Sequence, residues 1–314
     1  MVTSCSGDQH RNGDDHSCFG FTIHSGYPLK FLRHGRGKET LEVVQSAASL
    51  EPVQATLLLE WTLRDPNADV TARLYDANGV FHFWSSDAGW YRIDPRARRI
   101  EMSLHTDEIR REQRLWGIPT ALCLMDRGDL VLHAAAVEVN GAAIVLAAPG
   151  RFGKTTLALA FHRNGYRLLT EDAACCSLSP KPVLFPGPTC VRLRPDMFDG
   201  DAPAGTTVTA IRNDRIHLTL DGDCRGNGEP VPLGAVVFLR ESREDVLVQR
   251  VQGGEVLPDL WTLALQLHTD TERRRSFSQL TRVAATIPIW NLYRPLQVAN
   301  LDEVVSTLVE TCCQ

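Results

Sequence analysis

The segment that most constrains this chain reads APGRFGKTT, from Ala148 to Thr156, and it joins an apolar strand-like run to an apolar helix-like run. Gly153, Lys154 and Thr155 fit the phosphate-loop pattern G-x-x-x-x-G-K-[ST], although Ala148 stands in place of its first glycine. In such a loop, backbone N–H groups and a helix N-terminus bind phosphate oxygens, the lysine reaches the β and γ phosphates, and the threonine hydroxyl binds Mg²⁺. The segment therefore predicts a site for a nucleoside triphosphate.

The flanks of this loop have the order that a phosphate loop requires. The preceding stretch, 137–147, predicts a short strand, a turn at Asn140-Gly141 and a buried strand, and the following apolar stripe ends at the helix-terminating pair Asn164-Gly165. We predict ATP and Mg²⁺ as the cofactors. The residues predicted to bind the nucleotide are Pro149, Gly150, Arg151, Phe152, Gly153, Lys154, Thr155 and Thr156.

Two adjacent carboxylates, Glu171 and Asp172, follow an apolar strand predicted at Arg167 to Thr170. We expect this strand to neighbour the P-loop strand, because an α/β sheet presents its ligands at the carboxyl ends of its strands. Phosphoryl transfer needs a carboxylate to hold Mg²⁺, and a second one can accept the proton of an acceptor hydroxyl. The interpretation is that Thr155 and Asp172 bind the metal and that Glu171 is the base, although the pattern leaves open which carboxylate is the base.

The remaining chain divides into two predicted domains. The first domain is predicted at residues 1–128. Residues from about 18 to 104 alternate short β-type runs with turn signals such as Asn78-Gly79, which predicts a small antiparallel unit, and a helix from 107 to 125 follows that Pro119 kinks or restarts. Residues 129–314 form the second predicted domain. It begins with strands at 130–139 and 142–147 and a helix at 154–164, and it ends with a helical region at 258–285, a strand at 289–293 and a helix at 301–311. The predicted fold class is α/β: a P-loop domain with a mixed sheet, preceded by a smaller β-rich α+β domain.

Charge and hydropathy exclude some classes of function. The net charge of −5 argues against non-specific binding of nucleic acid. No apolar run reaches the ~18 residues of a membrane span, and the N-terminus lacks the charged-then-apolar layout of a signal peptide. We therefore expect a cytoplasmic protein with no nucleic-acid or membrane partner.

Three further features carry weaker signals. Arg192 and Arg194 are candidate contacts for a substrate carboxylate or phosphate, because a guanidinium binds these groups with two hydrogen bonds; exposed strand charges are an equal alternative. The cluster 273–275 of three arginines is interpreted first as a solvated face, and phosphate, an acidic leader peptide or a neighbouring subunit are the alternative partners. His133 lies in the apolar run LVLHAAAV, where a lone histidine is ordinarily a hydrogen-bonded core residue.

Three ordered segments, LHAAAV (132–137), APGRFGKT (148–155) and GYRLLTEDA (165–173), together resemble the catalytic domain of HPr kinase/phosphorylase and its stand-alone relatives. The resemblance implies a P-loop kinase domain of the HPr-kinase type, in which His133, Lys154, Glu171 and Asp172 are catalytic. This chain has Glu-Asp where the family has Asp-Asp, and it lacks a clear counterpart of the segment associated with the phosphorylase reaction and HPr docking. The segment PGPTCVRLRPD (186–196) instead resembles HPr-kinase-like enzymes of biosynthetic clusters, some of which phosphorylate the C-terminal serine of lasso-peptide precursors.

The resemblance implies an ATP-dependent kinase that transfers a phosphoryl group to a hydroxyl, with a serine of a peptide such as a lasso-type precursor as the first acceptor. Two alternatives stay open: a kinase for a small molecule, such as a sugar or an antibiotic-type metabolite, and a nucleotide-binding regulator without turnover. HPr-kinase relatives form rings, so a homo-oligomer is a further expectation, but the different N-terminal unit does not imply a hexamer.

Overall fold

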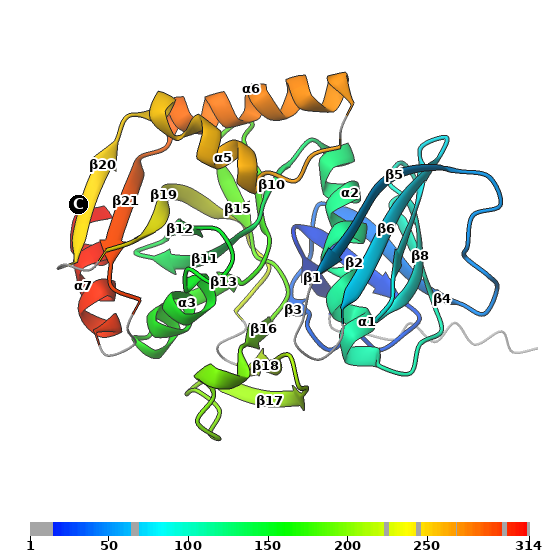
Figure 1. Ribbon diagram of the computed structural model, residues 1–314, viewed down its shortest axis with the longest axis horizontal. Coiled ribbons are helices and arrows are strands. Elements are labelled where there is room, and N and C mark those ends of the chain that lie inside the picture. Colours follow the sequence, from blue (N-terminus) through cyan, green and yellow to red (C-terminus); the bar gives the residue numbers. More distant parts are fainter. Residues whose placement is uncertain are drawn as a thin grey trace, which may run out of the picture.

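The computed structural model describes residues 15–63, 69–222, 226–242, 246–267, 269–296 and 300–312, so the first fourteen residues, on which the signal-peptide expectation largely rests, lie outside it. The described residues form two nine-stranded sheets and one three-stranded sheet. The first large sheet stands beside the second, and the small sheet lies below the junction in the view of Figure 1. The protein is therefore a mixed α/β structure with large mixed sheets.

The first sheet has the strand order β3-β1-β2-β4-β9-β8-β7-β6-β5. The expectation of an antiparallel unit is wrong in part, because β2 pairs in parallel with β4, and β4 pairs in parallel with β9. Between β2 and β4 the chain forms the short strand β3, which pairs with β1 at the edge of the sheet. The predicted hairpin at Asn78-Gly79 is confirmed, with φ angles of 57° and 88°. The strands are β1 His16–Cys18, β2 Phe21–Ser25, β3 Arg33–His34, β4 Glu39–Ser46, β5 Thr56–Leu63, β6 Val70–Ala77, β7 Val80–Ser85, β8 Gly89–Asp94 and β9 Arg99–Ser103.

Helices α1 (Glu108–Leu115) and α2 (Ile118–Arg127) close the first unit. The side chain of Asp107 caps α1 by accepting a hydrogen bond from the backbone N–H of Arg110 at 3.0 Å. Pro119 lies in the first turn of α2, where its missing N–H leaves no partner unsatisfied, so of the kink or restart expected there the structure shows a restart. Apolar residues of both helices are buried against the sheet, and they include Leu115, Trp116, Ala121 and Leu122.

The second sheet has the order β10-β14-β15-β19-β12-β11-β13, and β21 pairs with both β19 and β20. Two expectations need correction here. The strand predicted at 130–139 is divided at His133 into β10, which pairs with β14, and β11, which pairs with β12 and β13. The strand that precedes Glu171 is therefore separated from the P-loop strand by β11. The strands are β10 Leu130–Leu132, β11 Ala134–Val139, β12 Ala142–Ala147, β13 Arg167–Thr170, β14 Ala174–Ser177, β15 Val183–Phe185, β19 Val231–Glu241, β20 Leu247–Val251 and β21 Ile289–Arg294.

The antiparallel pairing of β13 with β11 and of β11 with β12 makes β13 run parallel to β12. β19 is parallel to β12, and β21 is parallel to β19. The carboxyl ends of these four strands consequently meet at one edge of the sheet, which is the edge where α/β folds bind ligands.

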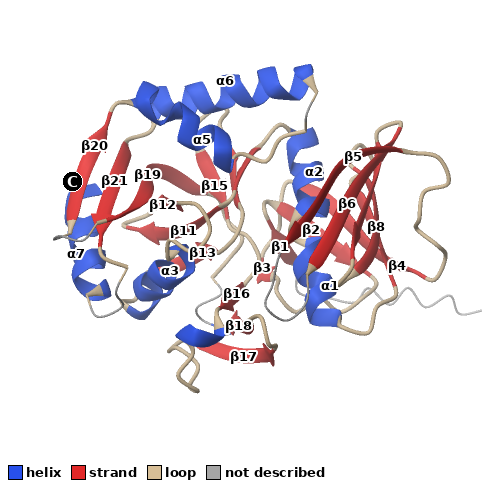
Figure 2. Ribbon diagram, viewed as in Figure 1, coloured by secondary structure: helices blue, strands red, loops and turns tan. Residues whose placement is uncertain are grey.

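Helices cover both faces of this sheet, as Figure 2 shows. Alternate residues of β11 and β12 point to opposite faces: Ala135 and Val137 pack with α3 and α7, whereas Ala134 and Ala136 belong to the cluster that packs with α5 and α6. The single helical region predicted at 258–285 is thus two helices. Among the described residues, no helix is both long and apolar enough to cross a bilayer. The helices are α3 Lys154–Arg163, α5 Leu257–Leu263, α6 Asp270–Thr286 and α7 Leu301–Cys312, with 3₁₀ turns at η1 Pro195–Met197 and η2 Gly253–Val256.

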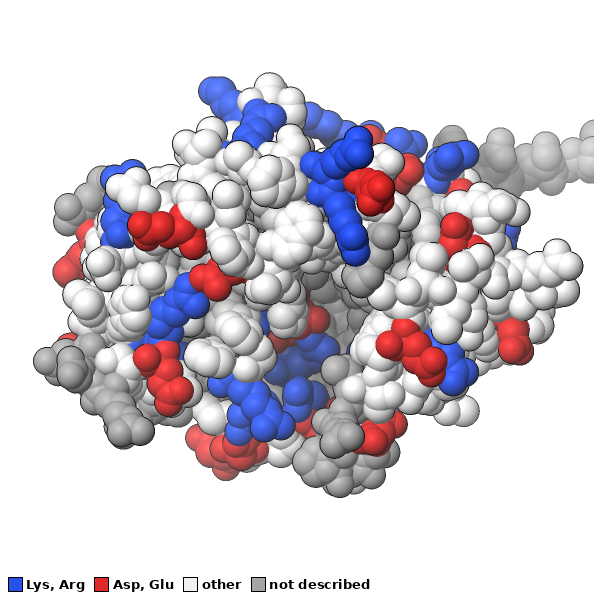
Figure 3. All heavy atoms as spheres, turned by 45° about the horizontal axis from the view of Figure 1, so that its top comes forward, with Lys and Arg blue, Asp and Glu red and all other residues white. Residues whose placement is uncertain are grey.

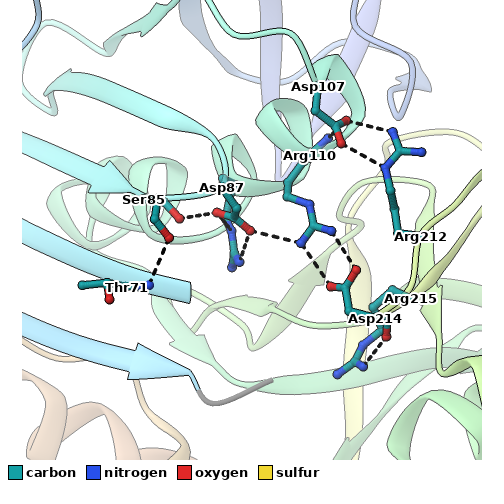
Figure 4. Close-up of polar contacts among 10 residues, drawn as sticks. Thr71, Ser85, Asp87, Asp107, Arg110, Arg212, Asp214 and Arg215 are labelled. Carbon is teal, nitrogen blue, oxygen red and sulfur yellow. Dashed lines mark hydrogen bonds and ion pairs between the residues drawn. The ribbon is translucent and has the colours of Figure 1, made fainter. Parts of the chain in front are cut away.

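The small sheet consists of β16 (Cys190–Leu193), β18 (Ile216–Leu220) and β17 (Thr206–Ile211) in that order. A charge network ties its β17–β18 turn to α1 (Figure 4). Arg110 lies 2.7 Å from Asp214 and 3.1 Å from Asp87, and Arg212 lies 2.9 Å from Asp107. The first unit and the small sheet are therefore held together on one side of the ligand-binding edge.

Candidate functional site

The predicted phosphate loop lies between β12 and α3, at the carboxyl edge of the second sheet. Its left-handed backbone positions are Arg151, with φ of 71°, and Gly153, with φ of 78°. Ala148 is fully buried and does not have a positive φ, which explains how alanine can replace the first glycine of the pattern. Leu157 donates its N–H to the carbonyl of Gly153 at 2.9 Å, so the free N–H groups of the first helical turn remain at the loop.

Lys154 begins α3 and folds its side chain back over the loop. Its Nζ donates to the carbonyl oxygen of Ala148 at 2.7 Å and to that of Pro149 at 3.2 Å. Burial lowers the pKa of Lys154, against the opposing charges of Asp172 and Glu171. The ammonium group is thus held beside the helix N-terminus, where its remaining donor can meet an anion.

The loop and the carboxylate pair are in direct contact. The hydroxyl of Thr155 donates to Oε1 of Glu171 at 2.5 Å. Arg192, from β16, bridges the pair: its Nε lies 3.4 Å from Oε2 of Glu171, and one terminal nitrogen lies 2.6 Å from Oδ2 of Asp172. The tertiary structure therefore brings three separate segments, around residues 155, 171 and 192, to one point.

The two carboxylates have different environments. Burial raises the pKa of Glu171, against the opposing charge of Arg192. Burial also acts to raise the pKa of Asp172, but the charges of Arg192, His133 and Lys154 outweigh it, so the net pKa is lowered. The side chain of Glu171 is 8% exposed and that of Asp172 is 46% exposed. Adjacent carboxylates with divergent pKa values are typical of acid–base chemistry.

His133 is not the core histidine that its apolar neighbours suggest. It lies between β10 and β11 with a half-exposed side chain, and its backbone N–H donates to the carbonyl of Leu263 at 2.8 Å. Its Nδ1 is 3.1 Å from the backbone oxygen of Asp172 and 3.4 Å from Oδ1 of the same residue. Partial burial lowers the pKa of His133, and Asp172 opposes that shift. The imidazole thus lies beside the exposed carboxylate.

A pocket of about 380 Å³, including its open mouth, adjoins the carboxylate pair. Its walls come from both units: Phe19, Gln113, Trp116 and Gly117 from the first, and Thr170, Glu171, Asp172, Ala173, Pro188, Cys190 and Arg192 from the second. Figure 3 shows a hollow between the two parts of the molecule, with acidic and basic side chains gathered in it. No signal in the sequence connects residues 19 and 113–117 with this pocket, because the contact is made only in three dimensions.

The other predicted residues lie apart from this pocket. Pro149, Gly150 and Arg151 are exposed on the loop, and Phe152 and Thr156 are half-buried. Arg194 pairs with the exposed Asp196 rather than with the carboxylate pair.

The chemistry of the donors fits Mg²⁺, although the described residues contain no preformed cluster of three histidine, cysteine or acidic ligands. Mg²⁺ prefers oxygen donors and is commonly held by one or two carboxylates together with substrate phosphates. The hydroxyl of Thr155 and the adjoining carboxylate of Glu171 supply such oxygens next to the phosphate loop.

Comparisons with known proteins add little. No protein-family model matches the sequence, and no curated protein matches it. Among solved structures, the chain is similar to the Hpr(Ser) kinase/phosphatase from Coxiella burnetii, with 12% sequence identity, a TM-score of 0.30, and coverage of 57% of this chain and 93% of that chain. At this identity and TM-score, the similarity by itself assigns no activity.

Proposed function

We propose that this chain is an ATP-dependent kinase that phosphorylates a hydroxyl group, with a fold of the HPr-kinase type. The contact between Thr155 and Glu171 carries the proposal, because it joins a GKT phosphate loop to a carboxylate pair at one sheet edge. Neither feature alone distinguishes a kinase from a nucleotide-binding protein. Together they supply a phosphate site and a proton acceptor beside an open pocket.

In this proposal, the loop and the first turn of α3 hold the triphosphate, and Lys154 neutralises its β and γ oxygens. Mg²⁺, held by Thr155 and Glu171 together with phosphate oxygens, would supply further neutralisation of the phosphate charge. The contact between these two residues supports assigning Glu171 to the metal. The exposure of Asp172 at the pocket, beside His133, supports Asp172 as the base, which exchanges the roles predicted from the sequence.

The carboxylate of Asp172 accepts the proton of the acceptor hydroxyl, the acceptor oxygen forms a bond to the γ phosphorus, and the bond between that phosphorus and the β–γ bridging oxygen breaks. The products are ADP and the phosphorylated acceptor. Arg192 and His133 position the base through their contacts with it. Positioning and electrostatics supply the rate, without a covalent intermediate on the protein.

The walls of the pocket favour a peptide serine over a sugar as the acceptor. Phe19, Trp116 and Pro188 present apolar surface, whereas Gln113 and Thr170 are its neutral polar side chains. The charged groups of the pocket, Glu171, Asp172 and Arg192, already pair with one another. A sugar would therefore bury several hydroxyl groups with few free partners, and each buried polar group without a partner costs about 1–3 kcal/mol. A serine has a single hydroxyl to satisfy. The segment 186–196 also resembles HPr-kinase-like enzymes of biosynthetic clusters. The pocket walls and this resemblance together favour a lasso-type precursor peptide as the acceptor.

The test compares wild type with Lys154→Met and with Lys181→Met, an exposed lysine that serves as the control. We expect wild type and Lys181→Met to consume ATP and to increase the mass of a serine-containing precursor peptide by about 80 Da per phosphoryl group. Lys154→Met should lose this activity. A wild type that binds ATP without any lysine-dependent turnover, with peptides or with sugars, would instead identify a nucleotide-binding regulator.

A further inference from the structure

A buried arginine touches the phosphate loop from the side opposite to the carboxylates. Arg294 is the last residue of β21, and it is 3% exposed. One of its terminal nitrogens donates to the carbonyl of Phe152 at 3.3 Å, and the other donates to the carbonyl of Pro295 at 3.1 Å. A Cβ at Gly153 would lie 2.5 Å from this guanidinium, so the loop and Arg294 are in close contact.

Within the described part of the chain, the positive charge of Arg294 has no anionic partner. Among the described residues, no carboxylate lies within 4.0 Å of its guanidinium, and its Nε, which is buried, has no hydrogen-bond partner. Burial lowers the pKa of Arg294, and no neighbouring carboxylate opposes that shift. Arg192, by contrast, is paired with two carboxylates. A buried cation without a counter-charge destabilises the free protein, so an anion that binds next to Arg294 gains a strong interaction.

The strand order indicates which part of a nucleotide that anion would be. Along the sheet edge the strands follow the order β13, β11, β12, β19 and β21. The carboxylates follow β13, the phosphate loop follows β12, and Arg294 ends β21, so the loop lies between the carboxylates and the arginine. The γ phosphate must face the carboxylates for transfer to occur. The nucleoside end of the triphosphate then extends toward β21.

We propose that Arg294 binds the α-phosphate of the nucleotide, a role that rests on the proposed kinase function. The α-phosphate supplies a counter-charge to the buried guanidinium. Because ADP and ATP both carry this phosphate, the contact anchors both nucleotides. It differs from the role of Lys154, which faces the β and γ positions of the same phosphate chain.

The experiment compares Arg294→Met, Arg294→Lys and wild type, with Arg250→Met as the control. Arg250 is an exposed arginine on the neighbouring strand β20, and it lies over the ring of Trp290. The measurements are the Kd values of ADP, ATP and inorganic tripolyphosphate, and the Tm of the nucleotide-free protein.

For Arg294→Met we expect the Kd values of ADP and ATP to rise by about tenfold or more, because charge-assisted hydrogen bonds are lost. Arg294→Lys should show a smaller increase. The Tm of nucleotide-free Arg294→Met should be unchanged or higher, because an uncompensated buried charge has been removed. Arg250→Met should bind all three ligands as wild type does.

Three results would overturn the inference. One is unchanged nucleotide affinity in Arg294→Met. Another is a weakening of ATP and tripolyphosphate binding without a weakening of ADP binding, which would place Arg294 at the γ-phosphate. The third is a lower Tm of the nucleotide-free variant, which would show that Arg294 only holds the loop. A wild type that binds neither ATP nor ADP would refute the kinase function itself, so the two failures are distinguishable.

Discussion

Replacing Arg192 with methionine should move the acid limb of the pH–rate profile to higher pH. The guanidinium of Arg192 lies 2.6 Å from Oδ2 of Asp172, and its charge favours the ionised carboxylate. If Asp172 accepts the acceptor proton, it must be ionised, and activity falls as the pH drops through its pKa. Removing the cation raises that pKa, so the loss of activity begins at a higher pH.

The size of the shift follows from the geometry. Two unit charges about 4 Å apart attract by about 4 kcal/mol at an effective dielectric constant of about 20. One pKa unit corresponds to about 1.4 kcal/mol, so the full attraction is equivalent to about 3 units. Water screens part of it, because the side chains of Arg192 and Asp172 are 27% and 46% exposed. We therefore expect the acid limb to rise by about 1–2 pH units.

The assay is kcat/KM for ATP turnover as a function of pH in wild type, Arg192→Met, Arg192→Lys and Arg194→Met. The lysine variant keeps a positive charge and should shift the limb less. Arg194 is the matched control, because it lies on the same segment and pairs with Asp196 instead of the carboxylate pair. The pH at which the acid limb falls, rather than the maximal kcat/KM, decides between the outcomes. An acid limb of Arg192→Met that coincides with that of wild type would refute the electrostatic role of Arg192.

Two further predictions concern buried contacts, one within the first unit and one at its junction with the second, and both are measured by denaturant unfolding. Glu112→Gln should lower the free energy of unfolding by about 2–3 kcal/mol, because the buried carboxylate accepts two backbone N–H groups at 2.7 and 2.8 Å and an amide nitrogen would face one of these donors. A loss below about 0.5 kcal/mol would contradict this reasoning. Gly187→Ala should destabilise by about 1–3 kcal/mol, because its Cβ would lie 2.5 Å from Thr170 and 2.6 Å from Phe19 of the first unit. Gly26→Ala, which meets no atom within 4 Å, is the control, and equal stability of the two variants would show that the junction repacks without strain.

Local patterns were sufficient for the order of strand, loop and helix around the GKT segment and for the hairpins. The turn at Asn140-Gly141 joins β11 to β12 as predicted, and α3 begins at Lys154, directly after the glycine of the motif. These features depend on residues that are neighbours in the chain, so hydrophobic periodicity and the preference of glycine and asparagine for positive φ identify them.

Expectations about strand neighbours failed for a physical reason. Residues 130–139 read as one apolar strand, but the break at His133 lets β10 and β11 pair with different strands. Apolar character reports burial, and it does not report the hydrogen-bonding partner. The insertion of β11 between β12 and β13 therefore became visible only in the tertiary structure, although the parallel direction of β13 still brings Glu171 to the predicted edge.

The sequence by itself identified the GKT loop, with its lysine and threonine, and the carboxylate pair as the candidate site, since each is a short motif with local chemistry. Only the tertiary structure decided that Thr155 contacts Glu171, that Arg192 bridges the carboxylates, and that Arg294 reaches the loop from β21. It also decided that residues of the first unit form one wall of the pocket. Such contacts join residues far apart in the chain, and they arise from strand order and packing, which periodicity and composition do not encode.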